Sequence, residues 1–191
     1  MTLMRYIVVD LEATCWRERS DRTQMEIIEI GAVVLQTSAG PTRAEFSRFV
    51  KPIASPKLSE FCTELTSICQ EDVDHADYFW TVFPNFLEWI GEESFVLCSW
   101  GAYDLNQFRQ DCRRHGMTFP VTFEQHINLK KEFARWKNIR PCGMSKGLEL
   151  MKLPLAGQHH RAIDDARNIA TLAQLVLPRV EASASGGAAG K

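Results

Sequence analysis

The order of strand-like and helix-like segments is the feature that most constrains the fold of this chain. Three apolar or alternating segments come first, at residues 6–9, 27–36 and 44–52. They lie close together with links of hairpin length, which predicts antiparallel neighbours in one sheet. Two further strand-like runs, 94–100 and 123–130, then alternate with helical segments. This order predicts an α/β domain with a mixed five-stranded sheet and flanking helices.

The helices are predicted from apolar residues that recur at helical spacing. They cover residues 59–68, 77–89, 104–115, 130–137, 144–151 and 163–180. Ser59 is a typical N-cap for the first helix, and the phenylalanines of the second are expected in the core. The final segment, 181–191, is rich in Ala, Ser and Gly and is expected to be disordered. The domain is therefore predicted to span residues 1–180.

Composition excludes several classes of protein. The chain has 191 residues, 45% of them hydrophobic and 24% charged, which is typical of a single soluble globular domain. No apolar run is long enough to span a membrane, and no signal peptide precedes the first strand, so we expect a cytoplasmic protein. Six cysteines show no zinc-ligand spacing. A net charge of −2 argues against a protein that coats duplex nucleic acid, but not against a nucleic-acid enzyme.

Two acids follow the first apolar run, in the stretch YIVVDLEATC. Asp10 and Glu12 are two residues apart, so an extended chain places both side chains on one face. Carboxylates held side by side repel each other, and one pKa rises unless a cation lies between them. Alone, this pair could be an ordinary solvated strand end.

A third acid, Asp104, follows the fourth strand in CSWGAYDLNQF, where Gly101 opens the turn. The ordinary explanation is an acid in the first turn of a helix, stabilised by the helix dipole.

The segment GQHHRAIDDARNIATLA contains two histidines and two aspartates, and their register must be chosen. His159 with Asp164 and His160 with Asp165 have the same spacing. Ile169 lies on the apolar face of the last predicted helix, and four residues before it is Asp165, which therefore points toward the sheet. We predict that Asp165 and its partner His160 belong to the site, while Asp164 caps the helix or faces solvent.

These acids are expected to converge at one edge of the sheet. The four are Asp10, Glu12, Asp104 and Asp165. Such a cluster is untenable without cations, and two Mg²⁺ or Mn²⁺ ions would make it stable and catalytic.

At these positions the sequence resembles a known family. VVDLEATC, WGAYD and HHRAIDDARNIA resemble the three motifs of the DEDDh 3′–5′ exonucleases, in the DnaQ-like group of the ribonuclease H-like superfamily. DLEATCW, EIIEIGAVVL and CGMSKGLELMKLPLAGQHHRAIDDARNIA resemble the branch of histone-mRNA and small-interfering-RNA exonucleases and their KapD-like relatives. The resemblance covers roughly residues 4–177 and implies a ribonuclease H-like sheet.

The resemblance also implies roles for individual residues. The four acids would hold the two metals, and His160 would be the general base that accepts a proton from the attacking water. The reaction would release nucleoside 5′-monophosphates from the 3′ end of a single strand. The resemblance implies that the backbone of Leu11, Ala13 and Thr14 lies beneath the terminal nucleotide, with Leu11 near its base. Trp100 and Tyr103 could line the same cleft, although packing at the strand end explains Trp100 equally well.

A basic segment at residues 129–146 suits a nucleic-acid path, because Phe133 and Trp136 alternate with lysines and arginines. An ordinary solvated helix face is the alternative. The leading hypothesis is a 3′–5′ exoribonuclease. A 3′–5′ DNA exonuclease of the proofreading type and a non-catalytic RNA-binding module are the alternatives.

Overall fold

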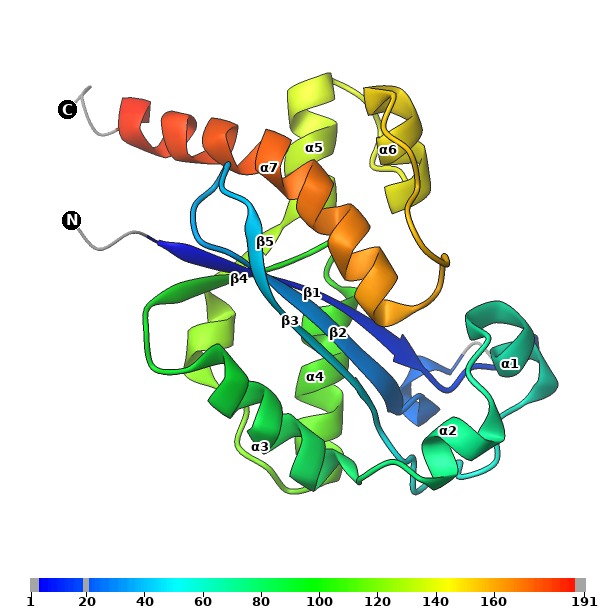
Figure 1. The fold of residues 1–191 in the computed structure, drawn as a ribbon. Coiled ribbons are helices and arrows are strands. Elements are labelled where there is room, and N and C mark those ends of the chain that lie inside the picture. Colours follow the sequence, from blue (N-terminus) through cyan, green and yellow to red (C-terminus); the bar gives the residue numbers. More distant parts are fainter. Residues whose placement is uncertain (1–3, 19–20, 188–191) are drawn as a thin grey trace.

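The computed structural model describes residues 4–18 and 21–187. Its centre is a five-stranded sheet with the order β3-β2-β1-β4-β5 (Figure 1). The strands are β1 (Arg5–Ala13), β2 (Ile27–Leu35), β3 (Thr42–Phe49), β4 (Phe95–Ser99) and β5 (His126–Asn128). The first three pair antiparallel, while β4 pairs parallel with β1 and with β5. The predicted mixed sheet and its antiparallel start are therefore confirmed.

Helices cover both faces of this sheet. They are α1 (Glu60–Thr66), α2 (Gln70–Asp74), α3 (Phe79–Ile90), α4 (Tyr103–Arg114), α5 (Leu129–Lys137), α6 (Met144–Met151) and α7 (Ala162–Gly187), with short 3-10 turns η1 (Arg22–Gln24) and η2 (Val121–Glu124). Figure 1 shows α3 and α4 on one face and α5, α6 and α7 on the other. Among the described residues, no helix has the length and apolar character needed to cross a membrane.

The alternation of β1 divides the core between these faces. Ile7, Val9 and Leu11 pack into a core that includes the predicted phenylalanines of α3. Tyr6 and Val8 pack into the other core, beneath α7. Because successive side chains of a strand point to opposite faces, the even-numbered series continues into Asp10 and Glu12. Both acids are thereby directed to the face on which α7 lies.

Several predicted boundaries need correction. β1 continues to Ala13, so the two acids lie within the strand rather than after it. The predicted fifth strand is shorter, because η2 occupies residues 121–124 and β5 has only three residues. α2 was not predicted at all.

The C-terminal helix is also longer than predicted. α7 continues to Gly187, so the expectation of disorder after residue 180 is not met for 181–187. The reason is an anchor at Glu181, whose carboxylate accepts hydrogen bonds from the hydroxyls of Tyr6 and Ser38. The rest of the predicted tail, 188–191, lies outside the described residues.

The aromatic residues of the basic segment do not form a stacking surface. Phe133 is fully buried in the core beneath α7. Trp136 packs edge-on against Phe133, and the guanidinium of Arg179 lies 3.9 Å from the centre of its ring. The prediction that these rings alternate with cations along a nucleic-acid path is therefore wrong, because α7 covers the apolar side of α5.

Candidate active site

A cavity of about 290 Å³ opens where β1 ends and where α4 and α7 begin. All five predicted catalytic residues line it: Asp10, Glu12, Asp104, His160 and Asp165. Four of the five predicted nucleotide-binding residues line it as well: Leu11, Ala13, Trp100 and Tyr103. The fold therefore brings together residues as far apart in the sequence as Asp10 and Asp165, which are separated by 165 − 10 = 155 positions.

A glycine in β2 allows α7 to approach the acids of β1. Gly31 pairs with Asp10 across the two strands. A Cβ atom at Gly31 would lie 2.1 Å from the carbonyl carbon of Ala162 and 2.2 Å from the nitrogen of Ile163. Only glycine leaves room for backbone this close. The first turn of α7 thus rests directly on the sheet beside Asp10, which places Asp165 over the strand.

A buried ion pair fixes the same turn. Glu29 lies opposite Glu12 in the pairing of β2 with β1, and it is only 1% exposed. Its carboxylate accepts hydrogen bonds from Nε and Nη2 of Arg161 at 3.2 and 3.1 Å, and from the backbone N–H of Ala162 at 3.0 Å. Sequence reasoning did not find this residue. The available signal was an acid inside the apolar run IIEIGAVVL, because a buried charge requires a partner.

The carboxylates form a tight group. One oxygen each from Asp10, Glu12 and Asp165 lie within 4.8 Å of one another. Asp104 joins them through the backbone, because its Oδ1 accepts a hydrogen bond from the N–H of Leu11 at 3.2 Å. That bond ties the start of α4 to β1 between its two acids.

Burial and mutual repulsion perturb these groups strongly. Burial, followed by the charges of Asp104, Glu12 and Asp165, holds the pKa of Asp10 well above its usual range. Burial and neighbouring carboxylates raise the pKa of Glu12 to about 8. Burial raises the pKa of Asp104 to about 6, although hydrogen bonds from backbone N–H groups, including that of Leu11, act in the opposite direction. Mg²⁺ and Mn²⁺ bind preferentially to oxygen ligands, and a cation between these carboxylates would relieve the repulsion that raises their pKa values. The residues therefore fit such ions.

The two histidines divide their contacts between two acids. Nδ1 of His159 lies 2.9 Å from Oδ2 of Asp165, and the backbone N–H of His160 donates to the same oxygen at 3.0 Å. Nδ1 of His160 lies 3.9 Å from Oε1 of Glu12. The rings stack with centroids 4.0 Å apart. The ring expected beside Asp165 was that of His160, and the structure places the ring of His159 there instead.

His160 adopts the left-handed conformation, with φ of 64°. This turns its backbone N–H toward Asp165 and its half-exposed ring into the cavity beside Glu12. Burial, together with the neighbouring His159, lowers the pKa of His160. A neutral imidazole in this position is able to accept a proton. The register of the aspartates is as expected: Asp165 is buried, whereas Asp164 accepts hydrogen bonds from Arg167 and from the backbone N–H of Gln158.

Two of the residues predicted to bind the nucleotide have surroundings that differ from those expected. Thr14 does not line the cavity, because its hydroxyl accepts from the N–H of Glu26 and its own N–H donates to the carbonyl of Glu26. Trp100 touches the cavity but is 8% exposed, and its Nε1 donates to the carbonyl of Cys142 at 2.9 Å. Packing therefore accounts for most of its surface.

The cavity also has walls that sequence reasoning missed. They are Cys15, Met25, Leu65, Met144 and His159. Apart from His159, these residues carried no local signal, because their places depend on how α1, η1 and α6 dock around the site.

Comparison with known proteins identifies the family. A family model described as Exonuclease (RNase_T) matches residues 7–173. The solved nuclease domain of 3'hExo, a DEDDh family member bound to rAMP, superposes with a TM-score of 0.86 and 27% identity over 93% of each chain. The chain belongs to the DEDDh family of 3′–5′ exonucleases.

Curated relatives of this DEDDh exonuclease chain are named as exonucleases or exoribonucleases. The 3'-5' exonuclease Snipper of Drosophila melanogaster is 32% identical over 187 residues, which cover 87% of this chain and 66% of that protein. The ERI1 exoribonuclease 2 of Homo sapiens is also 32% identical, over 87% of this chain and 27% of that protein. This chain thus spans less than two thirds of the length of both relatives.

Proposed function

We propose that this chain is a metal-dependent 3′–5′ exoribonuclease that releases nucleoside 5′-monophosphates from the 3′ end of single-stranded RNA. The observation that carries the proposal is the convergence of Asp10, Glu12, Asp104 and Asp165 with the ring of His160 in one cavity. The family membership of the chain supports the reaction class. The names of the ERI1 relatives and the rAMP bound to 3'hExo support RNA as the substrate.

The four carboxylates would hold two Mg²⁺ or Mn²⁺ ions. When bound, these cations neutralise the acid cluster and supply the Lewis-acid chemistry of a two-metal phosphodiesterase. The protein holds the carboxylates in place through contacts within and beneath the site. Glu29 and Gly31 seat the first turn of α7, and the N–H of Leu11 orients Asp104.

His160 would act as the general base. Its ring lies at the cavity beside Glu12, and its lowered pKa keeps it neutral and able to accept a proton near pH 7. In the proposed reaction, water attacks the terminal phosphorus and gives its proton to His160. The bond from phosphorus to the 3′ oxygen breaks, and this oxygen leaves on the shortened strand. Leu11 and Ala13 line the cavity, and they would lie beneath the departing nucleotide.

The test uses RNA and DNA strands of one sequence, labelled at the 5′ end, with Mg²⁺ or Mn²⁺. We expect stepwise shortening of the RNA from its 3′ end and slower shortening of the DNA. Asp165→Asn should abolish cleavage, whereas Asp164→Asn, a matched change at the neighbouring position, should keep most of it. Cleavage of neither strand by the unaltered protein would refute the proposal, and preferential cleavage of DNA would favour a proofreading-type exonuclease.

A further inference from the structure

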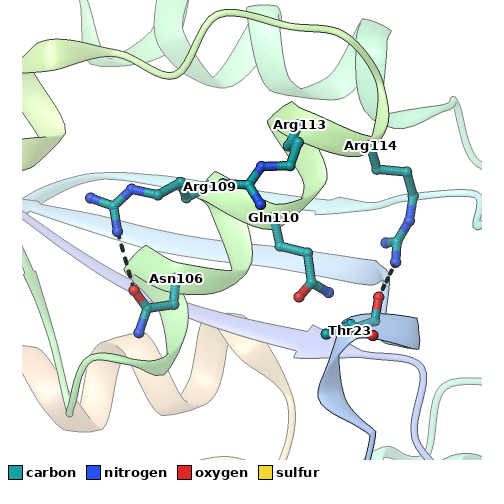
Figure 2. Close-up of a pocket in the computed structure, with 6 residues that line it drawn as sticks. All are labelled: Thr23, Asn106, Arg109, Gln110, Arg113 and Arg114. Atoms are coloured by element: carbon teal, nitrogen blue, oxygen red, sulfur yellow. Dashed lines mark hydrogen bonds between the residues drawn. The ribbon is translucent and has the colours of Figure 1, made fainter.

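A second cavity of about 480 Å³ lies beside α4, outside the acid cluster. Six side chains line it: Thr23, Asn106, Arg109, Gln110, Arg113 and Arg114. Figure 2 shows five of them along one side of α4, with Thr23 facing them from η1. Three of the six are arginines and none is acidic. The chemistry of this groove therefore suits an anion.

Helix α4 connects the groove with the catalytic cavity. Tyr103 lines that cavity and is the first residue of α4. Asn106, Arg109 and Arg113 follow it at intervals of three, three and four residues, which places them on one face of the helix. From Tyr103 to Arg113 this face is about 15 Å long at 1.5 Å per residue.

Met25 lies between the two cavities. Its side chain lines the catalytic cavity. On the other side, its carbonyl oxygen accepts hydrogen bonds from Gln107 at 3.0 Å, Gln110 at 2.8 Å and Arg114 at 2.7 Å. Met25 therefore contacts residues of the groove on one side and the catalytic cavity on the other.

The wall opposite α4 is held in place before any ligand binds. Nη2 of Arg114 donates to the carbonyl of Thr23 at 2.7 Å, and Gln110 donates to the carbonyl of Arg22 at 3.0 Å. These bonds fix η1 against the helix. A preformed wall reduces the ordering that a ligand would otherwise have to impose.

The positive charge of the groove is concentrated at one residue. Arg114 pairs with Asp111 at 2.9 Å, and Arg109 pairs with Glu124 at 2.9 Å. Arg113 is exposed, and in the described part of the chain its guanidinium has neither a hydrogen bond nor an ion pair. Its donors are thus available to a phosphate, which a guanidinium binds with two parallel hydrogen bonds.

We propose that this groove binds the sugar-phosphate backbone of the nucleotides that precede the 3′-terminal nucleotide of the RNA. The inference rests on the proposed function, since it assigns a path to the remainder of the same substrate. Arg113 would contact a phosphate, with Arg109 and the amide of Asn106 alongside. Contacts of this kind hold the strand without reading its sequence.

The test compares a dinucleotide with a 12-nucleotide RNA, using Arg113→Ala. The dinucleotide is too short to reach Arg113, so it reports on the catalytic cavity alone. We expect kcat/KM on the longer RNA to fall about tenfold more than on the dinucleotide, through KM. The slope of log affinity against log salt should become shallower by about 0.7, the value for one lost phosphate contact to a single strand.

Arg43→Ala is the matched control. Arg43 is an exposed arginine of β3 that pairs near Leu35, at the opposite end of the sheet from the acids, and its removal changes the net charge equally. This substitution should leave kcat/KM unchanged on both the dinucleotide and the 12-nucleotide RNA. Equal losses on the two RNA lengths, or equal losses for Arg43→Ala and Arg113→Ala, would overturn the inference.

A binding measurement separates this inference from the proposed function. Fluorescence anisotropy of the 12-nucleotide RNA in EDTA requires no hydrolysis. Weaker binding by Arg113→Ala than by Arg43→Ala supports the groove even if the unaltered protein cleaves no RNA, a result that would refute the function. Unchanged binding by Arg113→Ala, in a protein that does cleave RNA, would refute the groove alone.

Discussion

Gly31→Ala should disable the site from a position that does not line it. The new Cβ would lie 2.1 Å from the carbonyl carbon of Ala162, whereas ordinary contact begins at 3.4 Å. To restore ordinary contact, the first turn of α7 or β2 must move by about 3.4 − 2.1 = 1.3 Å. That turn carries Asp165, so the acid shifts away from Asp10 and Glu12.

The size of the effect follows from this displacement. A misplacement of about 1 Å among reacting groups can cost on the order of 100-fold in rate, so we expect a loss of that size in kcat/KM on RNA. Overpacking of a core typically costs about 1–3 kcal/mol, which corresponds to a decrease of roughly 2–10 °C in Tm for a domain of this size. Exonuclease assays and thermal unfolding measure the two effects separately.

The control is Gly143→Ala, where a Cβ would meet nothing within 4 Å and φ is −62°. This variant should keep nearly full activity and stability. If Gly31→Ala retained the activity and the Tm of the unaltered protein, the argument that close backbone contact between β2 and α7 positions Asp165 would be refuted.

Three further predictions concern the site. Stabilisation by Mn²⁺, measured as the difference in Tm with and without EDTA, should grow from pH 5 to pH 8. The raised pKa values of Glu12, about 8, and Asp104, about 6, mean that the metal-free protein binds more protons than the unfolded chain. Its own stability therefore decreases as pH rises through this window, while metal binding becomes easier as fewer protons must be displaced. Equal stabilisation at both pH values would contradict this. His160→Ala should lower kcat by at least about 100-fold with little change in Tm; a larger loss for His159→Ala would assign the base to that residue. Glu29→Gln should cost about 1–3 kcal/mol in denaturant unfolding, because it breaks a buried ion pair; no change in stability would show that this pair does not hold α7.

Local patterns were sufficient to predict which acids meet. The alternation of β1 places Asp10 and Glu12 on one face, and the apolar face of α7 selects Asp165 over Asp164. Both inferences use periodicity, which survives tertiary packing because it determines which side chains are buried. The pairing of the histidine rings could not be predicted in this way. It depends on the left-handed backbone of His160, and no local pattern in the sequence specifies that conformation at this histidine.

The position of Thr14 outside the cavity lining could not be predicted for a related reason. The pairing of β1 with β2 shifts between Glu12 and Ala13, so that Ala13 opposes Ile27 rather than Ile28. This irregularity interrupts the alternation that carries side chains to the cavity. Thr14 then pairs with Glu26 and leaves the cavity lining. A shift in register is set by how two strands meet, and the sequence of one strand does not reveal it.

Repulsion within the acid cluster destabilises the metal-free protein, and the surrounding contacts explain how the fold tolerates it. Two of the repelling carboxylates are held by contacts with groups other than the acids of the cluster. Asp165 is held by the pairing of Glu29 with Arg161 and Ala162, and Asp104 is oriented by the N–H of Leu11. These bonds prevent the acids from relieving their repulsion by moving apart, so the repulsion appears instead as raised pKa values. Divalent cations would remove that penalty without any movement of the backbone. The same rigidity that destabilises the metal-free protein should therefore increase its affinity for metal.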